Sequence, residues 1–239
     1  MSNEPLLAVK NVRAKYGEFI AVADASFDVP EKSIVSVIGS NGAGKSTLMD
    51  CIAGVHKPVS GHILFKGEDI TGMSPDRIIA RGLALVPQGS RCFTRMTVED
   101  NLIMGSFPKR ARAGRKEYLK KVYDLFPMLY EKRNDISGIL SGGQRQMIAI
   151  GRALMSAPEL VLFDEISLGL APMIIKDIYA RIRQIHREGV SVVLVEQDVV
   201  RSKKTSSYSY IMLKGEVALS GRSEDLDDES VKNAYFGVR

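Results

Sequence analysis

The stretch GSNGAGKST at residues 39–47 has residue types and spacing that can hold phosphate. The pattern G-x-x-x-x-G-K-[ST] is met by Gly39, Gly44, Lys45 and Ser46. Glycines allow backbone N–H groups to turn toward phosphate, the lysine reaches the outer phosphate oxygens, and the serine hydroxyl ligates Mg²⁺. We therefore predict a nucleotide site. It is formed by Gly39, Ser40, Asn41, Gly42, Ala43, Gly44, Lys45, Ser46 and Thr47.

An acidic pair follows the apolar run at 160–165, LVLFDE. Ligands collect at the carboxyl ends of strands in a parallel sheet, so we expect Asp164 near the Mg²⁺ ion together with Ser46. Glu165 is then placed to polarise a water for attack on the γ-phosphate. The predicted reaction is hydrolysis, with Glu165 as base and Lys45 at the outer phosphates. A plain strand-to-turn transition is the alternative.

A second glycine-rich stretch, ILSGGQRQ at 139–146, stands where a helix begins. Ser141 can cap this helix, with the glycines forming a turn. A helix N-terminus with bare N–H groups is also an anion site. The stretch has no lysine, preceding strand or metal-binding acid of its own. It cannot be a complete nucleotide site, but it could complete one that another subunit builds.

Buried strands must position these residues. Short apolar runs at 34–38, 83–88, 160–164 and 190–196 alternate with helical patterns, which indicates a parallel α/β sheet. The first thirty residues instead show a strand–turn–strand pattern. The strand before the glycine-rich stretch at 39–47 and the helix after it favour phosphate binding over a turn that only caps a helix.

A helical pattern over about 97–157 interrupts the alternation, and we interpret it as an inserted subdomain between 1–96 and 158–239. Hinges are expected near 88–95 and 134–139. The length of 239 residues suits one such domain.

The composition indicates a soluble globular protein, with 45% hydrophobic residues, 26% charged residues and a net charge of +5. No apolar run reaches the length of a membrane span, and we expect a cytosolic protein unless a partner holds it at a membrane. The basic run at 109–121 is interpreted as a solvated helical face rather than a site for nucleic acid or lipid. Cys51 and Cys92 are interpreted as reduced thiols.

The stretch LSGGQ at 140–144 resembles the signature motif of ATP-binding cassette (ABC) ATPases, and the other motifs occur in that family's order. The resemblance implies a P-loop NTPase (RecA-like) parallel core, an N-terminal antiparallel β subdomain and an inserted α-helical signature subdomain. It implies ATP and Mg²⁺ as ligands, and a head-to-tail dimer with a shared site. Further contacts implied are Tyr16 to adenine, Gln88 to Mg²⁺, and Ser141, Gly142, Gly143 and Gln144 to the partner's ATP.

The forms SLGLAP, after Ile166, and VPQGSRCFTRMTVEDNL resemble the ATPase subunits of importers for branched-chain amino acids, urea and amides. This implies transport-coupled ATP hydrolysis at the cytoplasmic face of a cell membrane. The implied partners are permease subunits and a second ABC ATPase subunit or a copy of this chain. A periplasmic or surface substrate-binding protein takes part indirectly, and no nucleic acid does.

One residue and one segment depart from the family pattern. Gln197 stands where most relatives carry histidine; its amide can donate to γ-phosphate but cannot titrate, and we count it as catalytic. The segment 199–210 is mostly polar, which we interpret as drift on a surface helix; a short or mobile helix is the alternative. Two other functions stay open: a soluble ABC ATPase acting on ribosomes or DNA, and an ATP-binding regulator without turnover.

Overall fold

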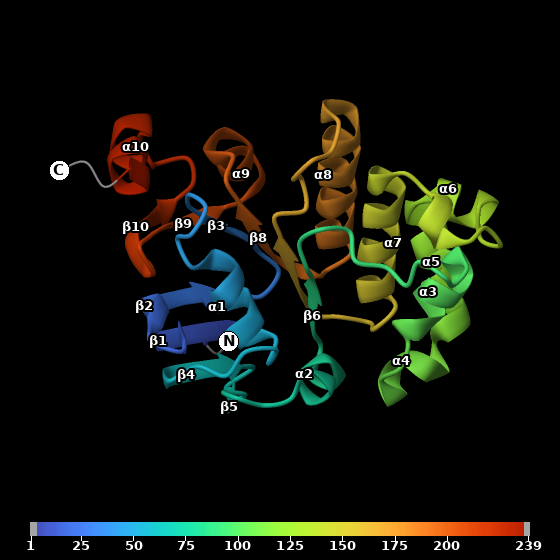
Figure 1. Cartoon of the computed structure of the whole chain (residues 1–239), viewed down its shortest axis with the longest axis horizontal. Coiled ribbons are helices and arrows are strands. Elements are labelled where there is room, and N and C mark those ends of the chain that lie inside the picture. Colours follow the sequence, from blue (N-terminus) through green and yellow to red (C-terminus); the bar gives the residue numbers. More distant parts are fainter. Residues whose placement is uncertain (1–3, 237–239) are drawn as a thin grey trace.

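The computed structural model describes residues 4–236, and their strands form one mixed sheet flanked by helices (Figure 1). The strand order across the sheet is β5-β4-β1-β2-β10-β9-β3-β8-β7-β6. The strands are β1 Leu7–Tyr16, β2 Phe19–Val29, β3 Ile34–Ile38, β4 Ser60–Phe65, β5 Glu68–Asp69, β6 Leu83–Val86, β7 Leu160–Asp164, β8 Ser191–Glu196, β9 Tyr208–Leu213 and β10 Glu216–Arg222. The helices are α1 Lys45–Ile52, α2 Pro75–Arg81, α3 Val98–Met104, α4 Lys109–Ala113, α5 Arg115–Leu125, α6 Pro127–Glu131, α7 Gly142–Leu154, α8 Pro172–Arg187, α9 Val199–Thr205 and α10 Asp228–Phe236, with a 3₁₀ turn η1 Ser137–Ile139.

The strands β9, β3, β8, β7 and β6 run parallel to one another and form the core of the sheet. All residues of β3, β7 and β8 are buried, as their apolar, largely β-branched sequences require. The predicted parallel α/β core is confirmed. Parallel pairing aligns the carboxyl ends of these strands: Ile38 pairs with Glu196, and Asp164 pairs with Val195. The turns that follow the three strands therefore meet at one edge of the sheet.

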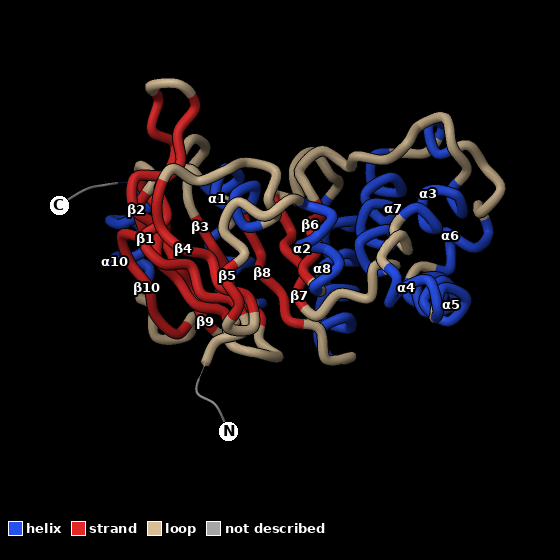
Figure 2. The backbone as a smooth tube through the Cα atoms, turned by 90° about the horizontal axis from the view of Figure 1, so that it is seen from below, coloured by secondary structure: helices blue, strands red, loops and turns tan. Residues whose placement is uncertain are grey.

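β1 and β2 form the predicted N-terminal antiparallel hairpin; β1 also pairs antiparallel with β4, and β4 pairs antiparallel with β5 at the outer end of the sheet. The hairpin is continuous with the core rather than separate, because Glu216 of β10 pairs with Asp24 of β2. Figure 2 shows the strands as one curved sheet at one end of the molecule. No helix in residues 4–236 is long and apolar enough to cross a membrane.

Helices α3–α7 lie together beyond β6, at the right of Figure 1. Thr97 caps α3 by accepting from the Asp100 N–H. The two chain connections to this block run side by side. The buried Asn101 joins them: its Nδ2 donates to Ser137 Oγ at 3.1 Å, and its Oδ1 accepts from the Phe93 N–H at 2.8 Å. That the block is a subdomain over 97–157 stays a prediction.

The polar segment after Asp198 forms the seven-residue helix α9, capped by the Asp198 side chain. The alternative of a short helix is therefore the one observed. Its serines are not all surface residues: Ser206 Oγ bonds Ser36 Oγ of β3 at 2.9 Å and Ser223 Oγ at 2.9 Å, and Ser209 Oγ joins both. A buried cluster of hydroxyl groups thus replaces apolar packing between α9, β3 and β9.

Candidate nucleotide site

The turn from Gly39 to Gly44 joins β3 to α1 and requires glycine at both ends. A Cβ at Gly39 would lie 2.5 Å from the Met212 carbonyl oxygen, and one at Gly44 would lie 2.3 Å from that of Ala21. Gly44 also has a left-handed φ of +95°. The turn encloses a cavity of about 230 Å³. Its lining residues are Asn41, Gly42, Gly44, Lys45, Ser46, Thr47, Gln88 and Glu165.

Lys45 is buried at the start of α1, with 3% of its surface exposed. Its Nζ donates to the carbonyl oxygens of Gly39 at 2.8 Å and Ser40 at 3.0 Å. It also forms an ion pair with Glu165 Oε1 at 2.9 Å. The ammonium group is therefore held at the floor of the glycine-rich turn, next to the carboxylate.

The Glu165 carboxylate receives donors from three segments. Besides Lys45, Gln88 Nε2 donates to Oε2 at 3.3 Å and Gln197 Nε2 donates to Oε2 at 2.8 Å. Gln197 Nε2 also donates to Asn41 Oδ1 at 2.7 Å, which ties the end of β8 to the glycine-rich turn. A buried carboxylate beside a phosphate-sized cavity has the position that a general base needs.

Asp164 and Ser46 provide oxygen atoms at the same edge. Ser46 Oγ donates to Asp164 Oδ1 at 3.1 Å. Burial raises the pKa of the Asp164 carboxyl to about 6, against which the Ser46 bond acts. A hydroxyl and a carboxylate suit a hard cation such as Mg²⁺, which prefers few protein ligands alongside phosphate oxygens. Within the described residues no three His, Cys, Asp or Glu side chains gather as a metal site.

The signature residues lie outside the cavity. Ser141 caps α7: its Oγ accepts from the Gln144 N–H at 3.3 Å, and Gln144 Oε1 accepts from the Ser141 N–H at 3.0 Å. Gly143 packs against α8, where an added Cβ would lie 2.8 Å from Ile174 Cγ2. In Figure 1, α1 and α7 lie on opposite sides of β7 and β8. The chain therefore does not bring its own signature to its own glycine-rich turn.

Tyr16 also lies outside the residues that line the cavity. It is half-exposed at the end of β1 and contacts the His56 ring, with centroids 4.5 Å apart.

Two buried polar residues beside the site are absent from the sequence prediction. Glu196 precedes Gln197, and its Oε2 accepts from Ser167 Oγ at 2.8 Å. Gln146 of α7 accepts from Ser90 Oγ at 2.6 Å, close to Gln88 in sequence. The signal for Glu196 is a carboxylate that ends an apolar strand, as at Asp164. Gln146 carries no local signal because its partner is 56 residues away.

Comparisons with known proteins agree with this geometry. The sequence profile of the family described as ABC transporter matches residues 22–167, which include the glycine-rich turn, Gln88, the signature and Glu165. The high-affinity branched-chain amino acid transport ATP-binding protein BraG of Pseudomonas aeruginosa is 42% identical over 236 residues, covering 97% of this chain and all of BraG.

Two solved structures are also similar. An ATP-binding cassette of an ABC transporter in its ADP conformation has a TM-score of 0.82 and 28% identity, covering 95% of this chain and 93% of its own. A dimeric ATP-binding cassette in a post-hydrolysis state with ADP and phosphate has a TM-score of 0.76 and 25% identity, covering 92% of this chain and all of its own.

Proposed function

This chain belongs to the ABC transporter family of ATP-binding proteins, and we propose that it is the ATP-hydrolysing subunit of an importer of branched-chain amino acids. The observation that carries the proposal is the similarity to BraG, which extends over 97% of this chain. The P-loop and the signature each form one half of a nucleotide site, which suits a cassette that works in pairs.

In this proposal the P-loop residues 39–47 bind the phosphates of ATP. The buried ammonium of Lys45 and the N-terminus of α1 face the cavity and supply positive charge to the outer phosphates. The exposed face of Tyr16 stacks on adenine. Entry of the γ-phosphate draws the Lys45 ammonium away from Glu165, because phosphate carries more negative charge than one carboxylate.

Ser46, Asp164 and Gln88 would hold Mg²⁺ beside these phosphates. Ser46 and Asp164 are already in contact, and Gln88 lines the same cavity. The ion supplies charge neutralisation for the β- and γ-phosphates when bound. The raised pKa of Asp164 reflects a buried carboxyl with little compensating charge, which is the environment that a cation improves.

For hydrolysis, Glu165 accepts a proton from the attacking water once Lys45 turns to the phosphate. Gln197 donates its amide hydrogens, at present to Asn41 and Glu165, and is placed to donate to the γ-phosphate. Gln197 therefore orients the groups to which it donates, and its own charge does not change with pH. Hydrolysis by this route needs bulk solvent, other than the attacking water, to be excluded on the open side of the cavity.

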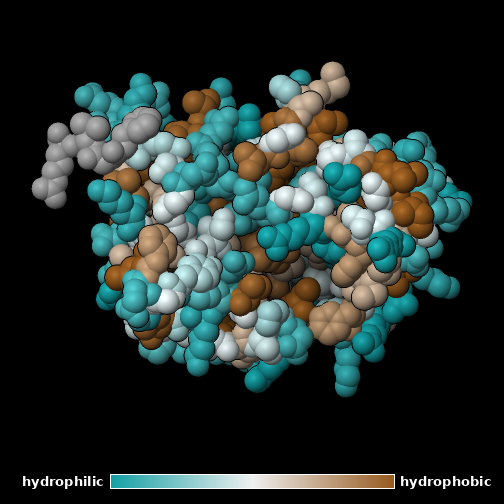
Figure 3. Space-filling model, in the orientation of Figure 1, coloured by the Kyte–Doolittle hydropathy of each residue, from teal (hydrophilic) through white to brown (hydrophobic). Residues whose placement is uncertain are grey.

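The signature of a second cassette closes that side. Exposed apolar side chains occur just before α7, at Ile139, and at and before the start of α8, at Leu168 and Met173, where α8 packs against Gly143. Figure 3 shows apolar residues gathered over the region of α8 and α7 on this face. Such a surface suits a protein partner, and the ADP-bound relative is a dimer. The partner is a copy of this chain or a related subunit, arranged head to tail.

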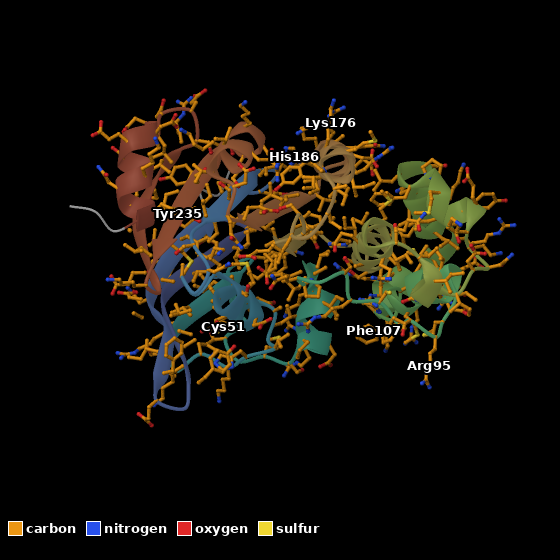
Figure 4. All side chains as sticks on the ribbon, turned by 45° about the horizontal axis from the view of Figure 1, so that its top comes forward. Cys51, Arg95, Phe107, Lys176, His186 and Tyr235 are labelled. Atoms are coloured by element: carbon orange, nitrogen blue, oxygen red, sulfur yellow. The ribbon has the colours of Figure 1, made fainter. Side chains whose placement is uncertain are left out.

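A membrane permease would dock at a separate apolar groove of about 210 Å³ between α2, α3 and α7. Phe93, Met104 and Phe107 on its rim are each close to half-exposed. Figure 4 shows Phe107 on the side of the helical block that also carries Arg95, which follows Gln88 by seven residues in the sequence. The position of a partner bound in this groove would depend on the position of Gln88. The partner would also hold the chain at the cytoplasmic face of the membrane. A substrate-binding protein takes part only through the permease.

The test is a tagged pull-down from detergent-solubilised membranes of the native host, with partners identified by mass spectrometry. We expect multi-span permeases and a second cassette subunit. A matched variant, Phe107→Asp, should lose the permeases while keeping its fold and ATP binding. Recovery of ribosomal or DNA-repair proteins without a membrane subunit would replace this proposal with the soluble alternative.

A further inference from the structure

Glu196, the last residue of β8, has a buried carboxyl next to the hydrolysis site. Only 3% of the residue is exposed. Oε2 accepts from Ser167 Oγ at 2.8 Å, and Oε1 has no hydrogen-bond partner among residues 4–236. Burial raises the pKa of this carboxyl. The Ser167 bond is the hydrogen bond of normal length that holds this buried carboxyl, while the neighbouring Tyr179 hydroxyl and Arg201 also favour its charged form.

The turn that Glu196 holds is the one that presents Glu165. Glu165 has a left-handed φ of +46°, which a residue with a side chain adopts only where its surroundings enforce it. Two bonds from the end of β8 enforce it here. The Glu165 N–H donates to the Val195 carbonyl oxygen at 2.9 Å, and Ser167 Oγ donates to Glu196 Oε2.

Glu196 also contacts the P-loop and directly precedes Gln197. Its carbonyl oxygen accepts from the Gly39 N–H at 3.4 Å. The next residue, Gln197, bonds both Asn41 and Glu165. Figure 1 shows why one residue can do this, since β8 lies between β3 and β7 in the sheet. Glu196 thus joins the strand that carries the P-loop to the strand that carries the acidic pair.

We propose that Glu196 is a positioning residue for hydrolysis, which fixes the turn at 165–168 through Ser167 and so aims the Glu165 carboxylate at the P-loop cavity. The proposal rests on the function proposed above, with Glu165 as base. It assigns no contact between Glu196 and ATP. Loss of the Ser167 bond should therefore lower turnover and leave nucleotide binding intact.

The surroundings of Glu196 suggest the variants. The Tyr179 hydroxyl of α8 is buried beside it and interacts with the Glu196 carboxylate. Burial and then the Glu196 carboxylate raise the pKa of Tyr179. In Glu196→Gln the amide oxygen can accept from Ser167, while the amide N–H can donate to the Tyr179 oxygen. In Glu196→Leu the volume is similar but the Ser167 bond is lost.

The experiment is steady-state phosphate release with Mg-ATP for the full chain, with kcat and KM measured separately. Glu196→Leu and Ser167→Ala should each lower kcat by about tenfold to a hundredfold, since small misplacement of a catalytic group has effects of that size. KM for ATP should stay within about twofold, and the double variant should be no slower than the worse single one. Glu196→Gln should keep kcat within about threefold of wild type.

Ser191→Ala is the matched control, because it removes a buried hydroxyl at the other end of β8 that accepts from the Lys32 N–H at 2.8 Å. Its kcat should be unchanged. Ser167→Ala, at a half-buried turn, keeps the test valid if Glu196→Leu does not fold. Wild-type kcat in Ser167→Ala, or a slow Glu196→Gln, would overturn the positioning role. A wild-type chain without Lys45-dependent turnover would instead contradict the proposed function itself.

Discussion

At the scale of single residues, the Glu165 carboxylate is the group on which the site converges. Lys45, Gln88 and Gln197 all contact it as donors. In the proposed mechanism, Lys45 and Gln197 also donate to the γ-phosphate, so binding of ATP would redistribute these bonds and free the Glu165 carboxylate to act as base.

Glu165→Gln removes the base but keeps the shape of the side chain. We expect ATP binding to persist and turnover to fall by about a hundredfold or more, the usual size of a general-base effect. Single-turnover phosphate release measures the loss, and sedimentation at saturating Mg-ATP should show a trapped dimer. Turnover within about threefold of wild type would assign the proton transfer elsewhere.

The raised pKa of Asp164 predicts that Mg²⁺ binding depends on pH. With its pKa raised to about 6 by burial, the carboxyl is ionised at pH 7.5 and roughly three quarters protonated at pH 5.5. Protons then compete with the ion, and the Mg²⁺ concentration for half-maximal binding of a fluorescent ATP analogue should rise about fourfold. An unchanged midpoint between these pH values would contradict Asp164 as a ligand.

The raised pKa of Asp164 also determines whether the free energy of unfolding rises or falls with pH. The folded chain holds this proton more tightly than the unfolded chain, whose carboxyl has an ordinary pKa of 3.8. The metal-free protein therefore loses stability as pH rises from about 4 through 6, and Mg²⁺ should restore it.

At the scale of elements, Ser141 at the start of α7 has two proposed roles, as a helix cap and as a phosphate ligand in another subunit. Ser141 forms a capping box with Gln144, which accounts for its presence structurally. The two glycines after it add no side chains of their own at the first N–H groups of α7, and none of these residues lines the chain's own cavity. Capping and phosphate binding in another subunit are therefore compatible readings.

Two substitutions separate these readings. Ser141→Asp keeps a good cap but places a negative charge where phosphate would bind, so stability should be retained and turnover should fall by about a hundredfold. Ser141→Ala should lower stability by about 1 kcal/mol, with a smaller effect on turnover. Thermal melts and phosphate release measure both. Full activity in Ser141→Asp would leave the cap as the only role of this residue.

At the scale of the whole molecule, local patterns predict the parts that local chemistry determines. The β-branched run at 34–38 and the glycine motif after it predict a buried strand and a P-loop, because neither depends on distant residues. Long-range contacts could not be predicted. Examples are the pairing of Glu216 with Asp24, the bond from Asn101 to Ser137, and the serine cluster of Ser36 and Ser206. Each joins residues whose neighbours in sequence give no hint of the partner.

The candidate site shows the same difference between local patterns, which could be predicted, and long-range contacts, which could not. The P-loop, Asp164, Glu165 and Gln197 meet in one chain because parallel pairing aligns the strands that precede them. The signature could be recognised but not located, since nothing in its sequence says whether α7 faces the chain's own P-loop. In the fold α7 begins beyond β7 and β8, away from the chain's own P-loop, which supports the proposal that a second cassette completes the site.

The most direct test of that claim mixes two inactive variants, Lys45→Ala and Ser141→Asp, in equal amounts and measures phosphate release. A mixed dimer pairs the intact P-loop of the second variant with the intact signature of the first. We predict recovery to about a quarter of the wild-type rate, because half of the dimers are mixed and each has one working site. Activity no greater than the sum of the separate variants would contradict a site shared between two copies.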